Sequence, residues 1–564
     1  MQSVQSPSFP VDAPAAAVEL YVRTYRTLLQ SAGETRLRTL ERPHAEMISS
    51  LHSRAASDVP DTGALIYAMQ RLPGALAQVR RVILGQSVEA IGRELGEDVS
   101  GWRAVSAPGR RRRWYWDGAE RIAVLVASES DVDDLVPTLV ALQIEWNKLH
   151  TRLHGVDLDA VDPGDLWGRL GVSAADWELL GEIAGGRALP WLRDVAREEK
   201  DLRVRSIGGT HAGYAGAIRR WWAPIEARLR ETGLDRRPLY FVSSNTHSLP
   251  NLLSGVAFRH EQAIIAHVER GGDPDLLPEL EKLRTGASRA SWANFLYFAA
   301  REYFAARPDA YNDRLEEERT AGIGYVAPGD SPVDVGAQII PVGALDPANF
   351  DDRLAPVDAE RLRASPAVIV NIDYPLGLAA YRILREVAED VESLAGVYVL
   401  GKAATLNASV GDVMVSNAVY DEHTKNTYWL ENCFSAREVE PYLVYGSALD
   451  GQRAVTVLGT FLQNRGHLEM YYREAYTVVE MEAGPYLSAV YEASHPTRHP
   501  VGQHVNLARL PFDLGILHYA SDTPYTQART LGARGLSYRG MDSTYAGAVA
   551  IMRRILAREG ALTV

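Results

Sequence analysis

Two continuous apolar strands separated by a helix-like pattern, between residues 367 and 401, limit the possible fold more than any other feature. The strands are "AVIVNI" (Ala367 to Ile372) and "GVYVLG" (Gly396 to Gly401). Strands that are apolar on both faces are typical of buried parallel sheets. The intervening apolar residues recur at helical spacing; they are Leu376, Ala379, Ala380, Ile383, Leu384 and Val387. The segment therefore predicts a βαβ unit.

Further apolar strands continue this pattern to the end of the chain. They are "DVMVSNAV", "AVTVLGT", "YTVVEM" and "GILHYA", and the helical pattern "STYAGAVAIMRRILARE" follows them. We therefore expect residues 335–564 to form an α/β domain in which helices sandwich a mixed sheet. Ligands bind at the carboxyl ends of the strands in such sheets. Three groups of residues fall at such ends: Gly401 and Lys402; Glu480, Met481 and Glu482; Ser521 and Asp522.

The chain, at 564 residues, is too long for a single hydrophobic core. Residues 1–306 show mainly helical spacing, with a hairpin near residue 115 and an isolated buried strand "PLYFVSS" (Pro238 to Ser244). They predict a mainly helical domain with a small amount of sheet. Residues 307–334 are rich in Gly, Pro and Asp, so we expect a linker there. The role of the first 306 residues stays open.

Composition excludes several classes of function. A formal net charge of -13 argues against a general nucleic-acid binder. The single cysteine, Cys433, excludes a disulfide framework and a cysteine-based zinc site. No signal peptide pattern and no apolar stretch long enough to cross a membrane is present, so we expect a cytoplasmic protein without a membrane partner. We expect neither a cofactor nor a metal.

Three segments of the last third resemble the signatures of the nucleoside phosphorylase and nucleosidase superfamily. They occur in that family's order; they are "LGKAATLNASVGDVMVSNAV" (residues 400–419), "VLGTFLQNRGHLEMYYREAYTVVEMEAGPY" (457–486) and "LHYASDTP" (517–524). The resemblance covers about residues 335–564 and implies cleavage of the N-glycosidic bond of a purine nucleoside or nucleotide. The closing "SDTP" and the large front domain resemble the AMP nucleosidase branch. A homo-oligomer is also expected.

The resemblance gives roles to the residues at the strand ends. Glycosidic cleavage develops positive charge on the sugar and negative charge on the leaving base. In the family, the second Glu of the Met-Glu pair accepts hydrogen bonds from the ribose hydroxyls and the Met packs on the sugar, which implies these roles for Glu482 and Met481. Asp522, next to Ser521, would donate a proton to the base, and Glu480 would help to position it. The simpler alternative is that both glutamates cap the helix that begins near residue 485.

The residues on either side of Gly401 bear on whether water or phosphate is the nucleophile. Phosphorolytic family members hold phosphate with an arginine before the glycine corresponding to Gly401 and a hydroxyl residue after it, whereas this chain has Val399 and Lys402. A lysine cannot reproduce the bidentate clamp of an arginine. Water is therefore favoured over phosphate, and Lys402 would contact a 5'-phosphate or close the pocket. The segment "IIPVGALDP" (residues 339–347) matches the family's phosphate loop weakly.

Two alternative functions and several weaker sites remain. The chain could be a nucleoside or nucleotide sensor without turnover, or an assembly protein whose helical half is the working part. In the front half, the turn from Ser243 to His247 is more easily explained by helix capping through Thr246 or Ser248 than by ligand binding. The basic run from Arg110 to Arg113 predicts a solvated hairpin strand rather than a phosphate patch.

Overall fold

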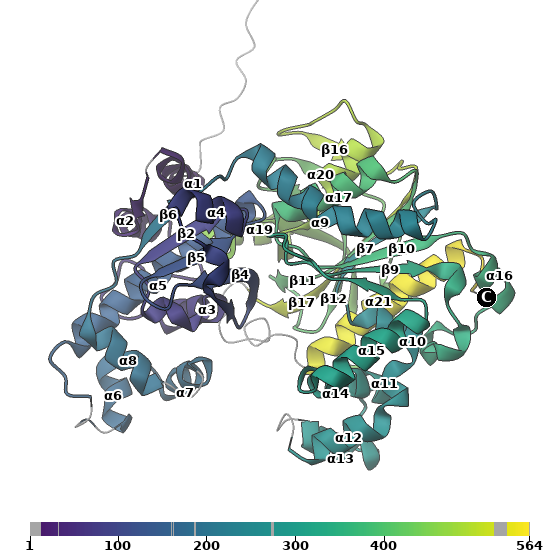
Figure 1. The fold of residues 1–564 in the computed structure, drawn as a ribbon, viewed down its shortest axis with the longest axis horizontal. Helices are drawn as coiled ribbons and strands as arrows, with labels where there is room; N and C mark the ends of the chain where they lie inside the picture. The colour runs from purple at the N-terminus through teal and green to yellow at the C-terminus, as the bar shows by residue number, and fades with distance from the viewer. Residues whose placement is uncertain are drawn as a thin grey trace, which may run out of the picture. The chain divides into compact units, whose positions relative to one another are not determined.

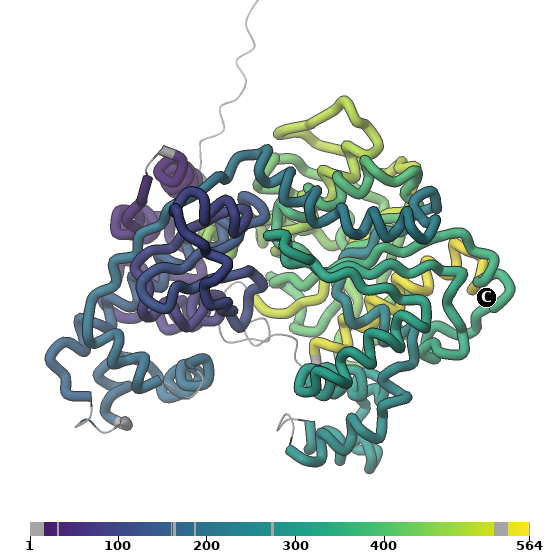
Figure 2. Tube along the Cα trace, viewed as in Figure 1, coloured from purple at the N-terminus to yellow at the C-terminus, as the bar shows by residue number. Residues whose placement is uncertain are grey.

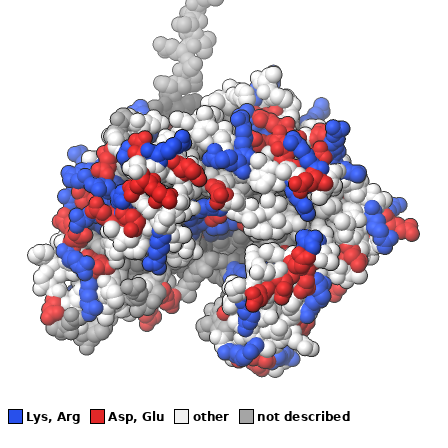
Figure 3. Space-filling model, in the orientation of Figure 1, with Lys and Arg blue, Asp and Glu red and all other residues white. Residues whose placement is uncertain are grey.

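The computed structural model describes residues 13–31, 33–158, 161, 163–184, 188–271, 276–523 and 538–562. The chain forms two compact units (Figures 1 and 2). Unit 1 comprises Met1–Ala217 and Val457–Ala475, and unit 2 comprises Ile218–Thr456, Tyr476–Thr523 and the C-terminal helix. No helix within the described ranges is long and apolar enough to cross a membrane. On the face drawn in Figure 3, basic side chains lie among acidic ones.

Unit 1 combines helices with more sheet than expected. Its helices are α1 (Ala13–Ser31), α2 (Arg38–Glu46), α3 (Thr62–Arg71), α4 (Val88–Leu95), α5 (Glu129–Leu153), α6 (Pro163–Leu170), α7 (Ala174–Ile183), α8 (Ala188–Arg197) and α19 (Arg465–Arg473). Its strands are β1 (Thr35–Arg36), β2 (Arg81–Gly85), β3 (Arg103–Ala107), β4 (Arg110–Trp116), β5 (Arg121–Leu125) and β6 (Arg203–Ser206). The described residues of this unit form one six-stranded sheet in the order β1-β6-β2-β5-β4-β3.

The basic run lies on β4, which pairs antiparallel with β3 and β5, so the predicted hairpin is confirmed. The run is solvated only in part, because Arg111 is exposed and Arg112 is not. Arg112 is buried and donates hydrogen bonds to Asp131 and Asp134 of α5, at 2.9 and 2.7 Å. Burial raises the pKa of Asp134, but Arg110 and Arg112 lower it to about 2. The run is basic because it neutralises the start of a buried helix.

Unit 2 is built on a larger sheet. Its strands are β7 (Leu239–Ser244), β8 (Gly324–Val326), β9 (Ala337–Pro341), β10 (Val368–Asp373), β11 (Leu394–Thr405), β12 (Val413–Asp421), β13 (Thr427–Trp429), β14 (Ala448–Thr456), β15 (Val478–Glu480), β16 (His504–Asn506) and β17 (Asp513–Asp522). Within the described residues the order is β16-β13-β12-β14-β15-β11-β7-β10-β9-β8, and β17 pairs with β11 and β12. Parallel and antiparallel pairs both occur, so the sheet is mixed, as expected.

Helices cover both faces of this sheet. They are α10 (Ser248–Ser254), α11 (Val256–Arg259), α12 (Glu261–Glu269), α13 (Leu276–Arg284), α14 (Trp292–Ala305), α15 (Pro308–Thr320), α16 (Ala359–Ala364), α17 (Leu378–Asp390), α18 (Ala436–Val439), α20 (Ala483–Ser494) and α21 (Tyr538–Arg558), while α9 (His211–Glu231) spans the boundary between the units. In Figure 1, α17 and α20 lie on one side of the strands, and α10, α14, α15 and α21 lie on the other. The predicted βαβ unit is present as β10, α17 and β11.

The boundary between the units differs from the expected one. Strand β7, which the sequence placed in the front domain, lies between β10 and β11 and is parallel to both. All residues of β7 are buried, which is typical of a strand in the interior of a parallel sheet with a neighbouring strand on each side. Residues 307–334 are not a plain linker, because they contain α15 and β8, and β8 pairs with β9. The core of unit 2 includes Phe295 and Tyr297 of α14, so this helix, which the sequence placed in the front domain, belongs with the sheet.

The chain leaves unit 2 after β14 and returns at β15. The intervening segment, Val457–Ala475, belongs to unit 1. Phe461 of this segment packs edge-on against Tyr67, with ring centroids 5.2 Å apart, and belongs to the core of unit 1. The motif that the sequence presents as one stretch, residues 457–486, is therefore divided between the two units.

Candidate functional site

Glu480 ends β15 inside a ring of hydrogen-bond donors. Its neighbour in the sheet is Thr456, the last residue of β14, whose hydroxyl donates to Oε1. The backbone N–H groups of Glu482 and Ala483 donate to Oε2, at 2.5 and 2.6 Å. These are the first N–H groups of α20, which have no partner within the helix. Glu480 therefore caps α20, as the simpler alternative predicted.

Glu482 is not explained by capping. It occupies the position before α20, but its side chain makes no capping bond with the helix. Its Oε1 instead accepts a hydrogen bond of 3.0 Å from the N–H of Gly377, in the loop between β10 and α17. Gly377 has a φ of 52°, a conformation that residues with a Cβ rarely adopt. The buried carboxylate of Glu482 is thus held between two loops.

The two carboxylates together hold a proton near neutral pH. Burial, and then the charge of Glu482, raise the pKa of Glu480 to about 8, although its three donors oppose this shift. Glu480 and Glu482 are 3% and 6% exposed, and Met481 between them is 9% exposed. Two like charges in such a site do not both ionise readily. The pair can therefore give or accept a proton at physiological pH.

A histidine that the sequence analysis missed lies beside this pair. The Nε2 of His518, on β17, is 3.9 Å from Oε2 of Glu480, and both side chains are fully buried. Burial lowers the pKa of His518 to about 4, so the ring is neutral. Neither ring nitrogen has a hydrogen-bond partner among the described residues. A histidine inside the apolar run "GILHYA" was the signal that could have identified it.

Tyr374 covers the strand at Gly401. A Cβ at residue 401 would overlap the phenol ring of Tyr374, which comes from the loop after β10. Burial, followed by the charges of Glu482 and Glu480, raises the pKa of Tyr374 far above its ordinary value. Tyr374 therefore lies close to both carboxylates. Residue 401 is glycine because this ring occupies the space above it.

Lys402 does not join the group. It follows Gly401 on β11, and successive residues of a strand point to opposite faces, so its side chain leaves the face that Tyr374 covers. It is exposed, whereas Gly401 and Ala403 are buried. The geometry therefore does not support the expected contact between Lys402 and a ligand in the cluster formed by Glu480, Glu482, Tyr374 and His518.

Ser521 and Asp522 end β17, on the far side of β11 from β15. Asp522 pairs with Ala404, and Ala404 also pairs with Val479 of β15. Asp522 is therefore two strand spacings, about 10 Å, from the strand that carries Glu480. Ser521 donates to the carbonyl of Ala403 at 3.2 Å. The backbones of Asp522 and of the strand that carries the glutamates are thus two strands apart, across β11.

The turn from Ser243 to His247 reaches the same edge of the sheet. Ser243 accepts a hydrogen bond of 2.7 Å from the hydroxyl of Tyr486 on α20. The side chain of Asn245 accepts from the N–H groups of His247 and Ser248, at 3.1 and 2.7 Å. Capping is thus the correct explanation of this turn, but Asn245 performs it rather than Thr246 or Ser248.

The weakly matching phosphate loop lies elsewhere. Residue Pro341, inside the segment 339–347, pairs with Val368 at the start of β10. The cluster lies beyond the other end of β10, after Asp373, so the loop that follows Pro341 is at the opposite edge of the sheet. Among the described residues, no group of three His, Cys, Asp or Glu side chains is arranged to hold a metal ion.

Comparison with protein families gives one match, which spans most of the chain. Residues 37–557 match the model of a family of unknown function, DUF6909. The chain belongs to the DUF6909 family. No curated protein matches the sequence significantly.

Three solved structures that are similar to this DUF6909 chain each cover less than half of it. A putative methylthioadenosine nucleosidase from Weissella paramesenteroides has 9% identity and a TM-score of 0.27, over 42% of this chain and 89% of that one. The 5'-methylthioadenosine/S-adenosylhomocysteine nucleosidase of Neisseria meningitidis has 13% identity and a TM-score of 0.28, over 43% and 94%. Uridine phosphorylase from Schistosoma mansoni has 10% identity and a TM-score of 0.27, over 45% and 85%. Similarity at this level carries no argument about activity.

Proposed function

We propose that unit 2 cleaves the N-glycosidic bond of a purine nucleoside or nucleotide, with water as the nucleophile. The observation that carries this proposal is the buried pair of Glu480 and Glu482, which holds a proton near neutral pH about two strands from Asp522. A helix cap accounts for only one of the two carboxylates. The resemblance of residues 400–419, 457–486 and 517–524 to the nucleosidase signatures adds to this.

The proposed step balances as a hydrolysis. The bond from C1' of the ribose to the base nitrogen breaks, and Asp522 gives its proton to the leaving base. Glu482 accepts hydrogen bonds from the ribose hydroxyls, which strengthen as positive charge develops on the sugar. A water oxygen bonds to C1', and its proton passes to the ionised member of the carboxylate pair. Exchange with bulk water then removes that proton and returns one to Asp522, which restores the starting state. Met481 supplies apolar contact for the sugar.

Water is preferred over phosphate because of the charges at Gly401. Phosphate binding requires cations or a row of N–H groups beside the reacting carbon. Lys402 lies on the opposite face of β11 from Tyr374, and residue 399 is a buried valine. Neither residue supplies a positive charge to the carboxylate side of the strand.

One observation favours a second function, a nucleoside or nucleotide sensor without turnover. The ring of Tyr374 fills the space above Gly401, and the charges of both glutamates raise its pKa. A bulky side chain next to the strand end leaves less room for an attacking water. In this case Glu482 would still bind a ribose, and the ligand would survive intact.

Variants at the two key carboxylates test the proposal. We expect Asp522→Asn to reduce release of free base by about 10² to 10⁴-fold while ligand binding is nearly preserved, because only the acid is lost. Glu482→Ala should reduce both binding and turnover. Asp313→Asn, at an exposed aspartate of α15 in unit 2, is the matched control and should retain activity. Chromatography measures the free base, and calorimetry measures binding. Tight binding without free base from the wild type, for all purine ligands tried, would establish the sensor instead.

A further inference from the structure

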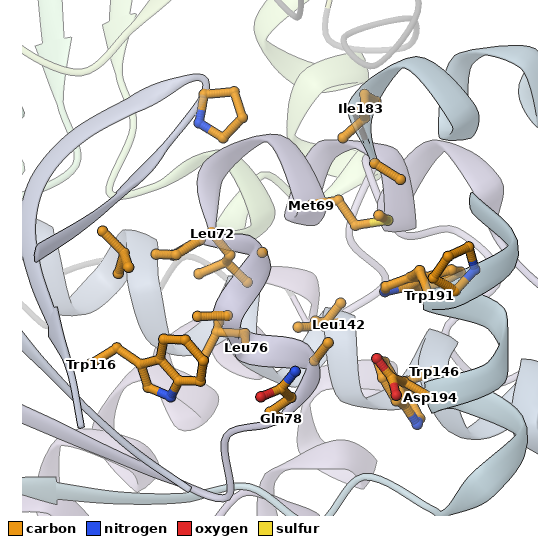
Figure 4. Close-up of a pocket in the computed structure, with 18 of the residues that line it drawn as sticks. Met69, Leu72, Leu76, Gln78, Trp116, Leu142, Trp146, Ile183, Trp191 and Asp194 are labelled. Atoms are coloured by element: carbon orange, nitrogen blue, oxygen red, sulfur yellow. The ribbon is translucent and has the colours of Figure 1, made fainter. Parts of the chain in front are cut away.

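Unit 1 contains a cavity that the proposed function does not use. Its volume is about 500 Å³, within the range of small-molecule sites. Seven elements contribute to its wall, from α3 to α8 and including the 3-10 helix Gly74–Ala77, and all of them belong to unit 1. In Figure 4, Trp116 and Trp191 lie on opposite sides of the cavity, and Leu72, Leu76 and Leu142 lie between them.

Two of the three tryptophans that line this cavity have their indole N–H groups bonded to backbone carbonyls. The indole N–H of Trp116 donates to the carbonyl of Ala119, and that of Trp146 donates to the carbonyl of Glu198, each at 3.0 Å. Trp146 and Trp191 meet edge to face, with centroids 5.6 Å apart. Trp146 is buried, so the surface for stacking with a flat ring comes from the half-buried rings of Trp116 and Trp191.

The wall is held in place before any ligand enters. The ammonium group of Lys200 donates to the carbonyl of Ala77 at 2.6 Å and lies 4.5 Å from the ring centroid of Trp146. Lys200 thus joins the short 3-10 helix Gly74–Ala77 to helix α5. A preformed wall lowers the entropy cost of binding.

The polar side chains of the wall are those of Arg103, Gln78 and Asp194. The guanidinium of Arg103 lies 6.0 Å from the ring centroid of Trp116, and the other two define what the flat ring must carry. Gln78 offers an amide that both donates and accepts, and Asp194 offers a carboxylate that accepts. Both lie at the same edge of the cavity in Figure 4. Asp194 is only loosely paired, with its carboxylate 3.4 Å from Arg197. An amide and an acceptor side by side match the edge of a nitrogen heterocycle with an amino group.

We propose that this cavity is a second binding site, in unit 1, for a planar nitrogen heteroaromatic ring that carries an amino group. The ring stacks on the tryptophan faces, and its polar edge bonds to Gln78 and Asp194. The proposal stands independently of the chemistry in unit 2. It gives residues 1–217 a ligand-binding role that the sequence did not predict.

Fluorine NMR of the full chain labelled with 5-fluorotryptophan tests the site, with adenine as the probe. The resonances of Trp116 and Trp191 are assigned by single replacement with phenylalanine. We expect both to shift saturably with adenine. Ala75→Phe, which fills the cavity, should abolish the shifts, and Gln78→Ala should weaken binding about tenfold. Trp177→Phe, another half-buried tryptophan of unit 1 outside the cavity, should leave the affinity unchanged.

The internal controls separate this site from the one in unit 2. Trp429 belongs to unit 2, so a shift of its resonance reports on that unit alone. Gln78 is exposed, so its replacement should not alter folding. The absence of any saturable shift at Trp116 and Trp191 up to millimolar adenine would overturn the proposal. So would unchanged affinity in both Gln78→Ala and Ala75→Phe. Neither result bears on base release by unit 2.

Discussion

Replacing Glu480 with glutamine tests the charge state of the carboxylate pair. In the folded chain the pKa of Glu480 is about 8, against its ordinary value of 4.5. Between these pH values the folded state binds a proton that the unfolded state has lost, so the free energy of unfolding falls as pH rises. The difference, 8 minus 4.5, corresponds to roughly 5 kcal/mol across that range.

Glutamine imitates the protonated acid. Its carbonyl oxygen can accept from the N–H groups of Glu482 and Ala483, and its amide can donate to the hydroxyl of Thr456. Glutamine does not ionise, so the variant does not lose stability as the pH rises. The difference in the free energy of unfolding, variant minus wild type, should therefore increase by several kcal/mol between pH 5 and pH 8.

The assay is denaturant unfolding at pH 5, 6.5 and 8, followed by hydrogen exchange in peptides from β14 and β15. Hydrogen exchange in these peptides reports on unit 2 alone, so the assay does not assume that both units unfold together. Lower exchange protection in the wild type at pH 8, restored by Glu480→Gln, is the expected result. A difference between the two proteins that does not change with pH would refute the shared-proton interpretation.

Three further changes probe other parts of the structure. Gly401→Ala should destabilise unit 2 by about 1 to 3 kcal/mol in thermal unfolding, because the new methyl group overlaps Tyr374; wild-type stability would contradict the packing. Arg112→Ala should destabilise unit 1 by roughly 3 to 5 kcal/mol by leaving buried carboxylates unpaired, and an unchanged denaturation midpoint would be inconsistent with this. Burial lowers the pKa of His247 to about 3, so between pH 6.5 and pH 3 only the unfolded state binds a proton at this residue. The free energy of unfolding of unit 2 should therefore fall by about 1.4 kcal/mol for each pH unit of acidification. His247→Gln should flatten this dependence of stability on acidic pH.

Most of the central strands of unit 2 could be predicted because each contains a short apolar run that a buried sheet accommodates. The short strands β8, β13 and β16, at or next to the edges of the sheet, are partly exposed and have no such run, so the sequence did not predict them. The place of β7 could not, because a parallel neighbour can lie far away along the chain. Residues 457–475 were wrongly placed in the α/β domain for a related reason. They connect two adjacent strands, yet Phe461 contributes to the core of unit 1.

The site shows the same division. The sequence predicted that Glu480 and Glu482 end a strand, and it offered capping as the alternative, but it could not assign one function to each. That distinction depends on which N–H groups each carboxylate meets, and Gly377 comes from another loop. Tyr374 and His518 were missed because an isolated tyrosine or histidine carries no pattern until the fold brings it to the carboxylates.

The central claim is that unit 2 transfers a ribosyl group to water. The most direct measurement is incubation of the wild-type chain with purine nucleosides and nucleoside 5'-monophosphates in phosphate-free buffer, with mass spectrometry of the products. We predict free base together with an equal amount of free ribose or ribose 5-phosphate, and no dependence on added phosphate. Base release that requires phosphate and yields a sugar 1-phosphate, or no base release from any substrate, would contradict it.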